Sequence, residues 1–229
     1  MSGFFISFEG GEGSGKSTQI ARLAERLAEK GYDTFTTREP GGSPGGEALR
    51  HVILSGAARL LAPDLEILLF AAARADHVTS VIRPALARGS VVICDRFQDS
   101  TRVYQGLAGA DRRLVAALEH LAIGATQPDL TVLLDLPAAT GLARADQRRG
   151  GAVADRFESE ALAVHEARRQ RFLEIARSEP QRCVIVDGDR PIDDVAREVA
   201  FLALDRLDGR RREGRLPPAE PAATVPGPA

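Results

Sequence analysis

The chain has 229 residues, 44% of them hydrophobic, and a formal net charge of −2. This size allows one large domain with a buried core, and the near-neutral charge gives no electrostatic reason to expect nucleic acid as a partner. No apolar run approaches the roughly 18 residues of a membrane span, and the run FFISF at 4–8 is too short for a signal peptide. Cys94 and Cys183 lie within apolar runs and outside metal-binding spacings. We therefore expect a cytoplasmic protein with buried, reduced cysteines and no membrane contact.

Strand-like and helix-like patterns alternate along the chain. Apolar and β-branched runs of strand length lie at 4–8, 33–38, 90–95, 130–136 and 183–187. Helical patterns lie at 16–30, 45–55, 64–87, 111–123, 138–149, 155–177 and 192–207. This alternation predicts an α/β fold, a five-stranded parallel sheet with helices on both faces. Ligand-binding side chains are then expected where the strands end, at Glu9, Arg38, Glu39, Asp95, Arg96 and Asp135.

The composition changes after Leu207. Residues 208–229 hold five of the 13 prolines and almost no large apolar side chain. We expect one domain over 1–207 and a disordered Arg- and Pro-rich tail over 208–229, so that deleting 210–229 leaves activity and melting temperature nearly unchanged. The histidines lack the spacing of metal ligands and are interpreted as surface or supporting residues: His51, His77, His120 and His165.

A phosphate-binding motif follows the first predicted strand. Gly10 and Gly15, separated by four residues and followed by Lys16 and Ser17, have the spacing of a P-loop. Its glycines permit backbone angles that turn N–H groups toward phosphate oxygens, and the following helix adds positive potential at its N-terminus. Lys16 is predicted to contact the β- and γ-phosphates, and Ser17 to ligate Mg²⁺. The predicted nucleotide-binding residues are Gly10, Gly11, Glu12, Gly13, Ser14, Gly15, Lys16, Ser17 and Thr18.

A P-loop does not by itself distinguish a kinase from a switch or a mechanical ATPase. The chain has no Asn-Lys-x-Asp segment, which disfavours a guanine-nucleotide switch, and it is too short for the extra domains of most mechanical ATPases. A small-molecule kinase needs a second phosphate site. Arg38 and Arg96 can form it, because each guanidinium offers two donors to one phosphate. Arg74 lies in a predicted helix, where spacing alone favours a surface ion pair.

Five segments occur in the order of one enzyme family: FEGGEGSGKST at 8–18, TREPGG at 37–42, LLFAAAR at 68–74, DRFQDSTRVYQG at 95–106 and PDLTVLLD at 128–135. From about residue 3 to about residue 205 the chain resembles bacterial thymidylate kinases. The resemblance implies a P-loop nucleoside monophosphate kinase fold. It also implies ATP with Mg²⁺ as phosphate donor, dTMP as acceptor and dTDP as product, hence a role in dTTP supply. A homodimer is implied as well.

The resemblance further implies a dTMP site. Arg38 and Arg96 would hold the phosphate, Phe70 would stack on the thymine ring, and Arg74 would hydrogen-bond the base edge. This role for Arg74 replaces the surface ion pair that its spacing favours. The remaining implied contacts lie near the base (Ser100 and Thr101), near the sugar (Tyr104 and Gln105) and near the 3′-hydroxyl (Glu12). Asp95 would lie beside Mg²⁺ and the acceptor.

Members of the family differ in where a catalytic arginine lies. The variable P-loop positions of this chain hold no basic residue, whereas 144–156 reads RADQRRGGAVADR. The chain therefore resembles members with a mobile arginine-bearing lid, here 144–156 with a hinge at Gly150 and Gly151. Which of its arginines contacts the transferred phosphoryl group stays open. Phosphoryl transfer depends on alignment and charge stabilisation, so the catalytic candidates are Lys16, Arg38, Asp95, Arg96, Arg148 and Arg149, with Ser17 and Asp95 as metal ligands.

Two alternatives stay open. One is another nucleoside monophosphate or deoxynucleoside kinase, which a comparison of acceptors would distinguish. The other is a P-loop switch or partner-binding protein, which would hydrolyse ATP slowly and without stimulation by an acceptor.

Overall fold

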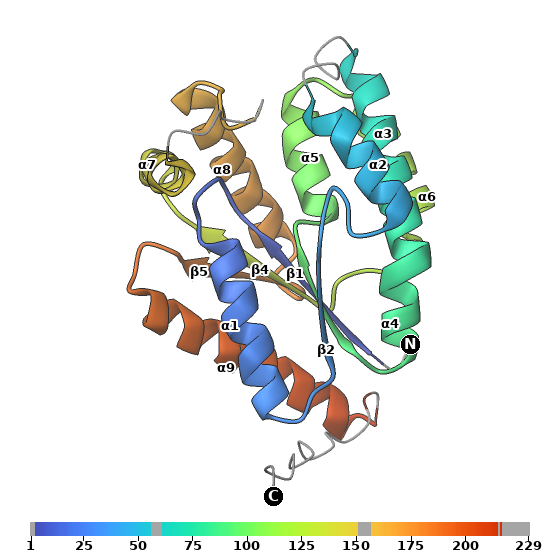
Figure 1. Cartoon of the computed structure of the whole chain (residues 1–229), viewed down its shortest axis with the longest axis vertical. Helices are drawn as coiled ribbons and strands as arrows, with labels where there is room; N and C mark the ends of the chain where they lie inside the picture. The colour runs from blue at the N-terminus through green and yellow to red at the C-terminus, as the bar shows by residue number, and fades with distance from the viewer. Residues whose placement is uncertain (1–2, 56–60, 151–156, 215, 217–229) are drawn as a thin grey trace, which may run out of the picture.

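The structure is a computed structural model that describes residues 3–55, 61–150, 157–214 and 216. Its centre is a five-stranded, all-parallel sheet in the order β2–β3–β1–β4–β5 (Figure 1). The strands are β1 (Phe4–Glu9), β2 (Thr34–Arg38), β3 (Val91–Asp95), β4 (Leu130–Asp135) and β5 (Cys183–Asp187). Each predicted strand is confirmed to within one residue at either end, and so is the parallel α/β fold.

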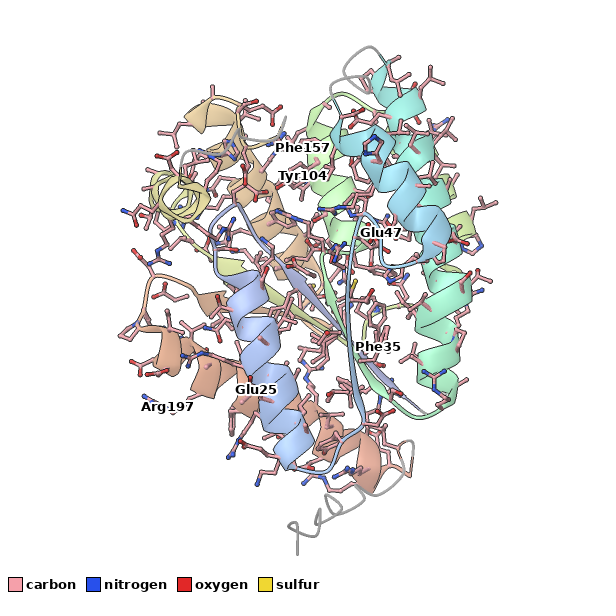
Figure 2. All side chains as sticks on the ribbon, viewed as in Figure 1. Glu25, Phe35, Glu47, Tyr104, Phe157 and Arg197 are labelled. Atoms are coloured by element: carbon pink, nitrogen blue, oxygen red, sulfur yellow. The ribbon has the colours of Figure 1, made fainter. Side chains whose placement is uncertain are left out.

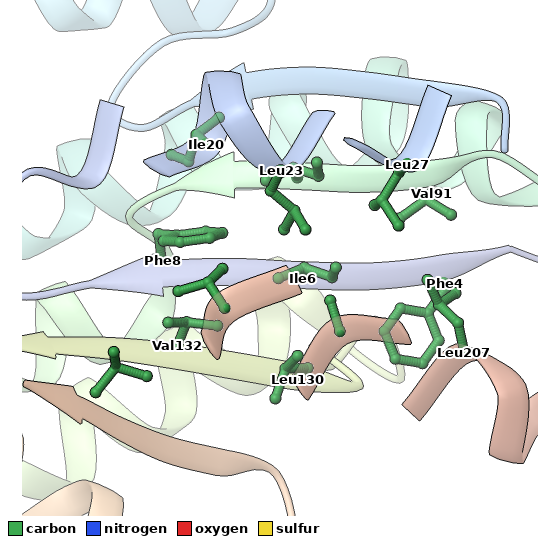
Figure 3. Close-up of a cluster of buried hydrophobic side chains, with 14 of the residues drawn as sticks. Phe4, Ile6, Phe8, Ile20, Leu23, Leu27, Val91, Leu130, Val132 and Leu207 are labelled. Carbon is green, nitrogen blue, oxygen red and sulfur yellow. The ribbon is translucent and has the colours of Figure 1, made fainter. Parts of the chain in front are cut away.

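One face of the sheet is covered by α1 (Lys16–Glu29) and α9 (Ile192–Arg212). These helices carry charged outer faces, marked by Glu25 and Arg197 in Figure 2. Their inner faces pack on Phe4, Ile6 and Phe8 of β1 (Figure 3). Full burial of a phenylalanine side chain stabilises a fold by about 1.5–3 kcal/mol. This apolar layer therefore fixes β1, and with it the start of the P-loop.

The opposite face is covered by other helical segments. Phe5, Val92 and Cys94 pack under the π-helical turn η2 (Val78–Ile82) and α4 (Arg83–Ala87), while Leu133 of β4 packs against α5 (Gln98–Leu107) and α8 (Leu162–Ser178). Successive strand residues thus enter two separate cores, which explains why the central strands are apolar without interruption. Four further helices complete the described fold: α2 (Pro44–Leu54), α3 (Pro63–His77), α6 (Arg112–Ile123) and α7 (Ala138–Arg149).

Local chemistry explains several helix boundaries. Ser43 caps α2 by accepting a hydrogen bond from the Gly46 N–H, and Pro44 occupies the first turn, where no N–H donor is needed. Asp111 caps α6 in the same way. The predicted helix at 64–87 is instead α3 (Pro63–His77) followed by η2 and α4. Pro84 accounts for the change, because its ring lacks an N–H and needs room near the carbonyl four residues earlier.

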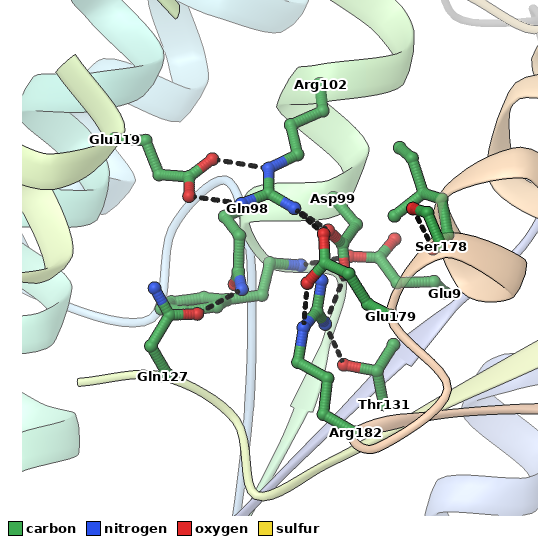
Figure 4. Close-up of polar contacts among 12 residues, drawn as sticks. Glu9, Gln98, Asp99, Arg102, Glu119, Gln127, Thr131, Ser178, Glu179 and Arg182 are labelled. Carbon is green, nitrogen blue, oxygen red and sulfur yellow. Dashed lines mark hydrogen bonds and ion pairs between the residues drawn. The ribbon is translucent and has the colours of Figure 1, made fainter. Parts of the chain in front are cut away.

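The pattern did not predict α5. Its buried positions are mostly polar, so the apolar repeat of an amphipathic helix is absent. A buried ion-pair network replaces apolar packing there: Arg182 donates to both oxygens of Asp99 at 2.7 and 2.8 Å, and Arg102 joins α5 to Glu119 and Glu179 (Figure 4). The predicted helix at 155–177 begins later, at Leu162. Residues 157–160 form a turn there, and 151–156 lie outside the described residues.

The predicted end of the last helix, and with it the start of the tail, was wrong. Helix α9 continues to Arg212, because residues just past 207 make tertiary contacts. Arg210 forms an ion pair with Asp129, and the Arg211 guanidinium lies 4.0 Å from the centre of the Tyr32 ring. The segment beyond 216 lies outside the described residues.

Both cysteines are buried, as predicted. Across the described part of the chain, none of the helices combines the length and the apolar character needed to cross a membrane.

Candidate active site

A cavity of about 320 Å³ opens at the carboxyl ends of β1, β2 and β3. Its walls are formed by the P-loop, by the segment that follows β2, by helix α3 and by the turn that leads from β3 into α5. Most of the predicted site residues meet in this one space, although they are spread over more than 130 positions: Glu12, Gly13, Ser14, Gly15, Lys16, Ser17, Thr18, Arg38, Phe70, Arg74, Asp95, Arg96, Ser100, Thr101, Tyr104, Gln105 and Arg148.

The P-loop has the backbone of an anion site. Gly10, Gly13 and Gly15 all have positive φ angles, of 142°, 65° and 91°. Gly15 is the residue before α1 and has no side chain to cap that helix, so the N–H groups of its first turn are open to a ligand. A Cβ atom on Gly13 would lie 2.0 Å from the Gly141 carbonyl oxygen, so the loop packs directly on α7.

Lys16 lies at the base of this loop and is buried. Its Nζ donates to the carbonyl oxygens of Gly10 at 3.1 Å and Gly11 at 2.9 Å. Burial lowers the pKa of Lys16, and the nearby Arg96 guanidinium lowers it further, whereas the carboxylates of Asp95 and Glu12 oppose that shift. The Lys16 ammonium group lies in a site of low dielectric, where its attraction to a phosphate is stronger than in water.

The predicted metal ligands lie next to each other. The Ser17 hydroxyl donates to Asp95 Oδ2 at 3.0 Å, and both residues line the cavity. A hydroxyl and a carboxylate are the hard oxygen donors that Mg²⁺ takes, with phosphates and waters filling its other positions. The described residues contain no group of three or more His, Cys, Asp or Glu side chains able to hold a metal. The Ser17–Asp95 pair supplies two oxygen donors and leaves the other positions of an ion to phosphates and waters.

The two arginines predicted to hold a phosphate have different surroundings. Arg38, at the end of β2, is more than half exposed and donates to Glu47 at 3.0 Å. Arg96 is mostly buried, and its φ of 68° is unusual for a residue with a side chain. Its backbone N–H donates to the Phe8 carbonyl at 2.9 Å, which ties this turn to β1.

Glu12 and Arg96 form a close pair, with Oε1 and Nη2 2.6 Å apart. Burial would raise the pKa of Glu12, but the charges of Arg96 and Lys16 and a hydrogen bond from Tyr104 outweigh it and bring the pKa to about 2. Burial likewise opposes the charge of Arg96, and the neighbouring Tyr104 and Glu12 nevertheless raise its pKa. Both groups are charged at neutral pH, and their mutual attraction holds the P-loop close to the turn after β3.

Glu9, the last residue of β1, holds the turn after β3 by accepting hydrogen bonds. It is buried, and it accepts hydrogen bonds from the Phe97 N–H at 2.8 Å and the Ser100 hydroxyl at 2.7 Å. Ser100 in turn accepts from Arg96 Nη1 at 3.2 Å. Burial and the charge of Asp99 raise the pKa of Glu9 to about 7, although Arg96 and the Ser100 and Phe97 hydrogen bonds pull it downward.

One wall of the cavity combines aromatic rings with polar side chains. Phe70 and Arg74 of α3 line it, and Thr101, Tyr104 and Gln105 of α5 line the same space. Tyr104 meets Phe157 edge-on, with ring centres 5.4 Å apart, between α5 and α8 (Figure 2). This aromatic pair narrows the cavity on the side of α8.

Arg74 is not at the surface, so the interpretation from spacing alone was wrong about its position. It does form an ion pair, but a buried one, with Glu39 at 2.7 Å. Its guanidinium also donates to the Phe97 carbonyl at 3.1 Å. These contacts place Arg74 in the wall of the cavity, where the family resemblance expects it.

The two lid candidates on α7 differ. Arg148 lines the cavity, whereas Arg149 pairs with Asp146 and with Glu158, which lies 3.0 Å from Arg149 Nη1. Arg144 turns away toward the Gly188 carbonyl. Gly150, the first of the two predicted hinge glycines, ends α7 with a φ of 59°. Gly151 and Arg156 lie outside the described residues.

The chain is similar in sequence to known proteins over most of its length. A sequence model described as thymidylate kinase matches residues 8–199. The chain is 57% identical over 206 residues to a protein named thymidylate kinase from Caulobacter vibrioides, covering 90% of this chain and 98% of that protein. It is also 57% identical over 206 residues to one from Afipia carboxidovorans, covering 90% of each.

The chain belongs to the thymidylate kinase family. Both the resemblance noted in the sequence and the predicted fold are thereby confirmed. Membership of the thymidylate kinase family does not test individual residues, so the roles given to the cavity side chains remain predictions.

The sequence placed Glu9 and Glu39 at the strand ends, where ligand-binding side chains were expected, but it gave neither of them a specific role. Two further side chains that shape the site, His77 and Phe157, were not among the predicted site residues. His77 was interpreted as a surface or supporting residue, and it is fully buried beside Glu39. Phe157 gave no signal, because its role depends on contact with Tyr104, 53 positions away in the chain.

Proposed function

We propose that this chain transfers the γ-phosphoryl group of ATP to dTMP and forms dTDP. One observation carries the proposal: a P-loop with a buried lysine and a pair of strand-end arginines line the same cavity. Two anion sites in one cavity suit a reaction that joins two phosphorylated substrates. Family membership and 57% identity to proteins named thymidylate kinase support dTMP as the acceptor.

The donor end of the cavity is the P-loop. Lys16 and the open N–H groups at the start of α1 would bind the β- and γ-phosphates of ATP. Ser17 and Asp95 would hold Mg²⁺, which supplies positive charge to the triphosphate when it is bound. Because these groups are fixed before the substrate arrives, they stabilise developing charge without reorganising.

The acceptor end is formed by α3, α5 and the two strand-end arginines. Arg38 and Arg96 would clamp the dTMP phosphate, and Phe70 would stack on the base. A phosphate monoester is largely ionised at neutral pH, so its oxygen can attack without a strong general base. The protein's main contribution is therefore alignment of the two phosphates and neutralisation of their charge.

Arg148 and Arg149 on α7 would stabilise charge on the transferred group. Arg148 supports this role by lining the cavity, and α7 touches the P-loop at Gly141. Closure of this segment would exclude water, which otherwise competes with dTMP for the γ-phosphoryl group.

A panel of acceptors tests the proposed function. ADP formation is measured with dTMP, dUMP, dCMP, AMP and thymidine at saturating ATP. We expect dTMP to give the largest kcat/KM. The preference over dUMP should be modest, about 10- to 200-fold, because the two differ by one methyl group. Equal rates with and without acceptor would indicate a slow ATPase or switch, and a better acceptor among the others would indicate a different kinase.

We also propose that the enzyme is a cytoplasmic homodimer, as the family resemblance implies. Helix α3 supports a subunit contact, because Leu65 and Leu68 lie one helical turn apart and are 52% and 44% exposed. Sedimentation velocity of wild-type protein and of Leu68→Arg measures the oligomeric state. A monomeric wild-type protein would contradict this part of the proposal.

A further inference from the structure

Arg74 of α3 lines the cavity, and a buried set of partners holds its side chain. Its Nε donates to Glu39 Oε2 at 2.7 Å, and its Nη2 donates to the Phe97 carbonyl at 3.1 Å. The Arg74 and Glu39 side chains are each only 4% exposed. The guanidinium also lies over the Phe97 ring, 5.3 Å from its centre. Nε and Nη2 share one edge of the planar guanidinium, so the protein occupies this edge.

Glu39 is itself held in one orientation. Its second oxygen, Oε1, hydrogen-bonds His77 Nδ1 at 3.1 Å, and His77 Nε2 hydrogen-bonds the Thr37 hydroxyl at 2.7 Å. His77 is fully buried. A Cβ atom on Gly42 would lie 2.4 Å from His77 Nε2, so the loop after β2 packs directly on the imidazole ring. The carboxylate therefore presents Oε2 to Arg74 in a fixed position.

The remaining nitrogen of Arg74, Nη1, has no acceptor within the described part of the chain, and Arg74 lines the cavity beside Phe70. We propose that Glu39 is a positioning residue for base selection: it fixes Arg74 so that Nη1 faces the cavity and favours a pyrimidine with a carbonyl at position 4. This inference rests on the proposed function, because it takes dTMP as the acceptor.

The physical reason is rigidity. A donor that cannot rotate away makes a hydrogen bond with the carbonyl of thymine or uracil, and it faces another donor in the amino group of cytosine. An unpaired buried polar group costs more than a missing contact, so a fixed donor rejects dCMP. An arginine free to change its conformation would avoid that conflict and discriminate less. A purely structural role for Glu39 predicts, instead, an equal loss with every acceptor.

Glu39→Gln tests the proposal, because it keeps the shape of the side chain and removes the charge that holds Arg74. We expect the dTMP/dCMP ratio of kcat/KM to fall by about tenfold or more, the size of one lost hydrogen bond to a charged group. The dTMP/dUMP ratio and the KM for ATP should not change, since both of these bases carry the carbonyl and the P-loop is intact.

Asp76→Asn is the matched control. Asp76 lies on the same helix and accepts from the Ser43 hydroxyl at 2.6 Å and the Ser80 hydroxyl at 3.2 Å. The Asp76→Asn substitution removes a carboxylate charge at the junction of α2 and α3. The described hydrogen bonds of Asp76 do not involve Arg74. Its dTMP/dCMP ratio should equal that of the wild type, and a fall as large as that of Glu39→Gln would overturn the proposal.

A double variant separates positioning from a direct contact. Once Arg74 is replaced by Ala, Glu39→Gln should change the dTMP/dCMP ratio no further. Arg74→Lys adds a test that keeps Glu39 intact: its single nitrogen would be engaged by Glu39, so the ratio should fall to that of Arg74→Ala. A wild-type ratio in Glu39→Gln, or a further fall in the double variant, would overturn the proposal.

If Glu39→Gln does not fold, as judged by circular dichroism, Arg74→Lys decides, and a wild-type ratio there overturns the proposal. Failure of the proposed function looks different. In that case the wild-type chain shows no ADP release that depends on dTMP.

Discussion

Glu9 is a carboxylate whose buried environment differs strongly from water. It lies at the end of β1, inside the fold, and faces the charges of Asp99 and Arg96 and the donors of Ser100 and Phe97. Since its pKa is raised from 4.5 to about 7, the folded protein binds a proton there more tightly than the unfolded chain. The stability that this proton contributes is complete below pH 4.5 and is lost as the pH rises through 7.

A Glu9→Gln variant should therefore become more stable relative to the wild type as the pH rises. Gln is neutral at all pH values and can still accept from the Phe97 N–H. The difference between pKa values of 4.5 and about 7 corresponds to about 3 kcal/mol. Urea unfolding of both proteins at pH 5 and pH 8 measures the change in their free-energy difference. A difference that is the same at both pH values would show that Glu9 does not titrate in this window.

At the residue scale, the sequence predicted which side chains line the cavity better than it predicted their partners. Lys16, Ser17 and Arg96 belong to local motifs whose spacing carries a chemical requirement. The partner of Arg74 lies 35 positions away in the chain, and that of Glu9 lies 91 positions away. Such pairs are set by the register of β1, β2 and β3, which no local pattern encodes.

At the scale of elements, the contact between the P-loop and α7 is tight enough to test. A Cβ atom on Gly141 would lie 2.3 Å from the Glu12 carbonyl oxygen. Alanine favours a helix over glycine by about 1 kcal/mol, so any loss in Gly141→Ala comes from this contact. We expect a lower melting temperature and a several-fold higher KM for ATP, because the P-loop or α7 must shift.

The matched control is Gly209→Ala on α9, where an added Cβ meets nothing within 4 Å. That variant should keep the KM for ATP and keep or raise the melting temperature. If Gly141→Ala behaves like Gly209→Ala, the close approach of α7 to the P-loop plays no part in nucleotide binding.

The end of α9 gives a second test at this scale. Arg210 pairs with Asp129, whose other oxygen accepts from the Phe5 N–H at 2.8 Å, and Leu216 joins the core under α1 and α9. Deleting 210–229 should lower the melting temperature by about 4 °C or more, since these contacts are worth about 2 kcal/mol and each kcal/mol shifts a domain of this size by about 2–4 °C. Deleting only 217–229 keeps every one of these contacts and should have little effect. Equal melting temperatures for the two deletions would restore the expectation from composition.

Elements differ in how readily the sequence predicts them, for physical reasons. The strands are buried on both faces, which leaves an uninterrupted apolar signal. Helix α5 is buried through ion pairs and hydrogen bonds, so its sequence looks like a loop. The last turn of α9 is polar in sequence. Tertiary contacts made by Arg210 and Arg211 keep it helical.

In the molecule as a whole, a single cavity is lined by both the P-loop and the strand-end arginines, which gives it two anion sites. We propose that the P-loop binds ATP and that the arginines at the ends of β2 and β3 bind dTMP. Arg96 is the most informative residue, because it is buried at the boundary between the sites and contacts Gly10 and Glu12 of the P-loop.

The most direct test measures both substrates on Arg96→Ala, with Arg96→Lys beside it. We expect kcat/KM for dTMP to fall by about 10- to 100-fold, the effect of losing a hydrogen bond to a charged group worth about 1.5–3 kcal/mol. The Kd for ATP, measured by calorimetry, should stay within about threefold of the wild type, a change of less than 1 kcal/mol. The kcat/KM of Arg96→Lys for dTMP should lie between those of the wild type and Arg96→Ala. Lysine keeps the positive charge but loses the paired donors of the guanidinium group. Equal losses for dTMP and ATP in Arg96→Ala would contradict the assignment of separate sites.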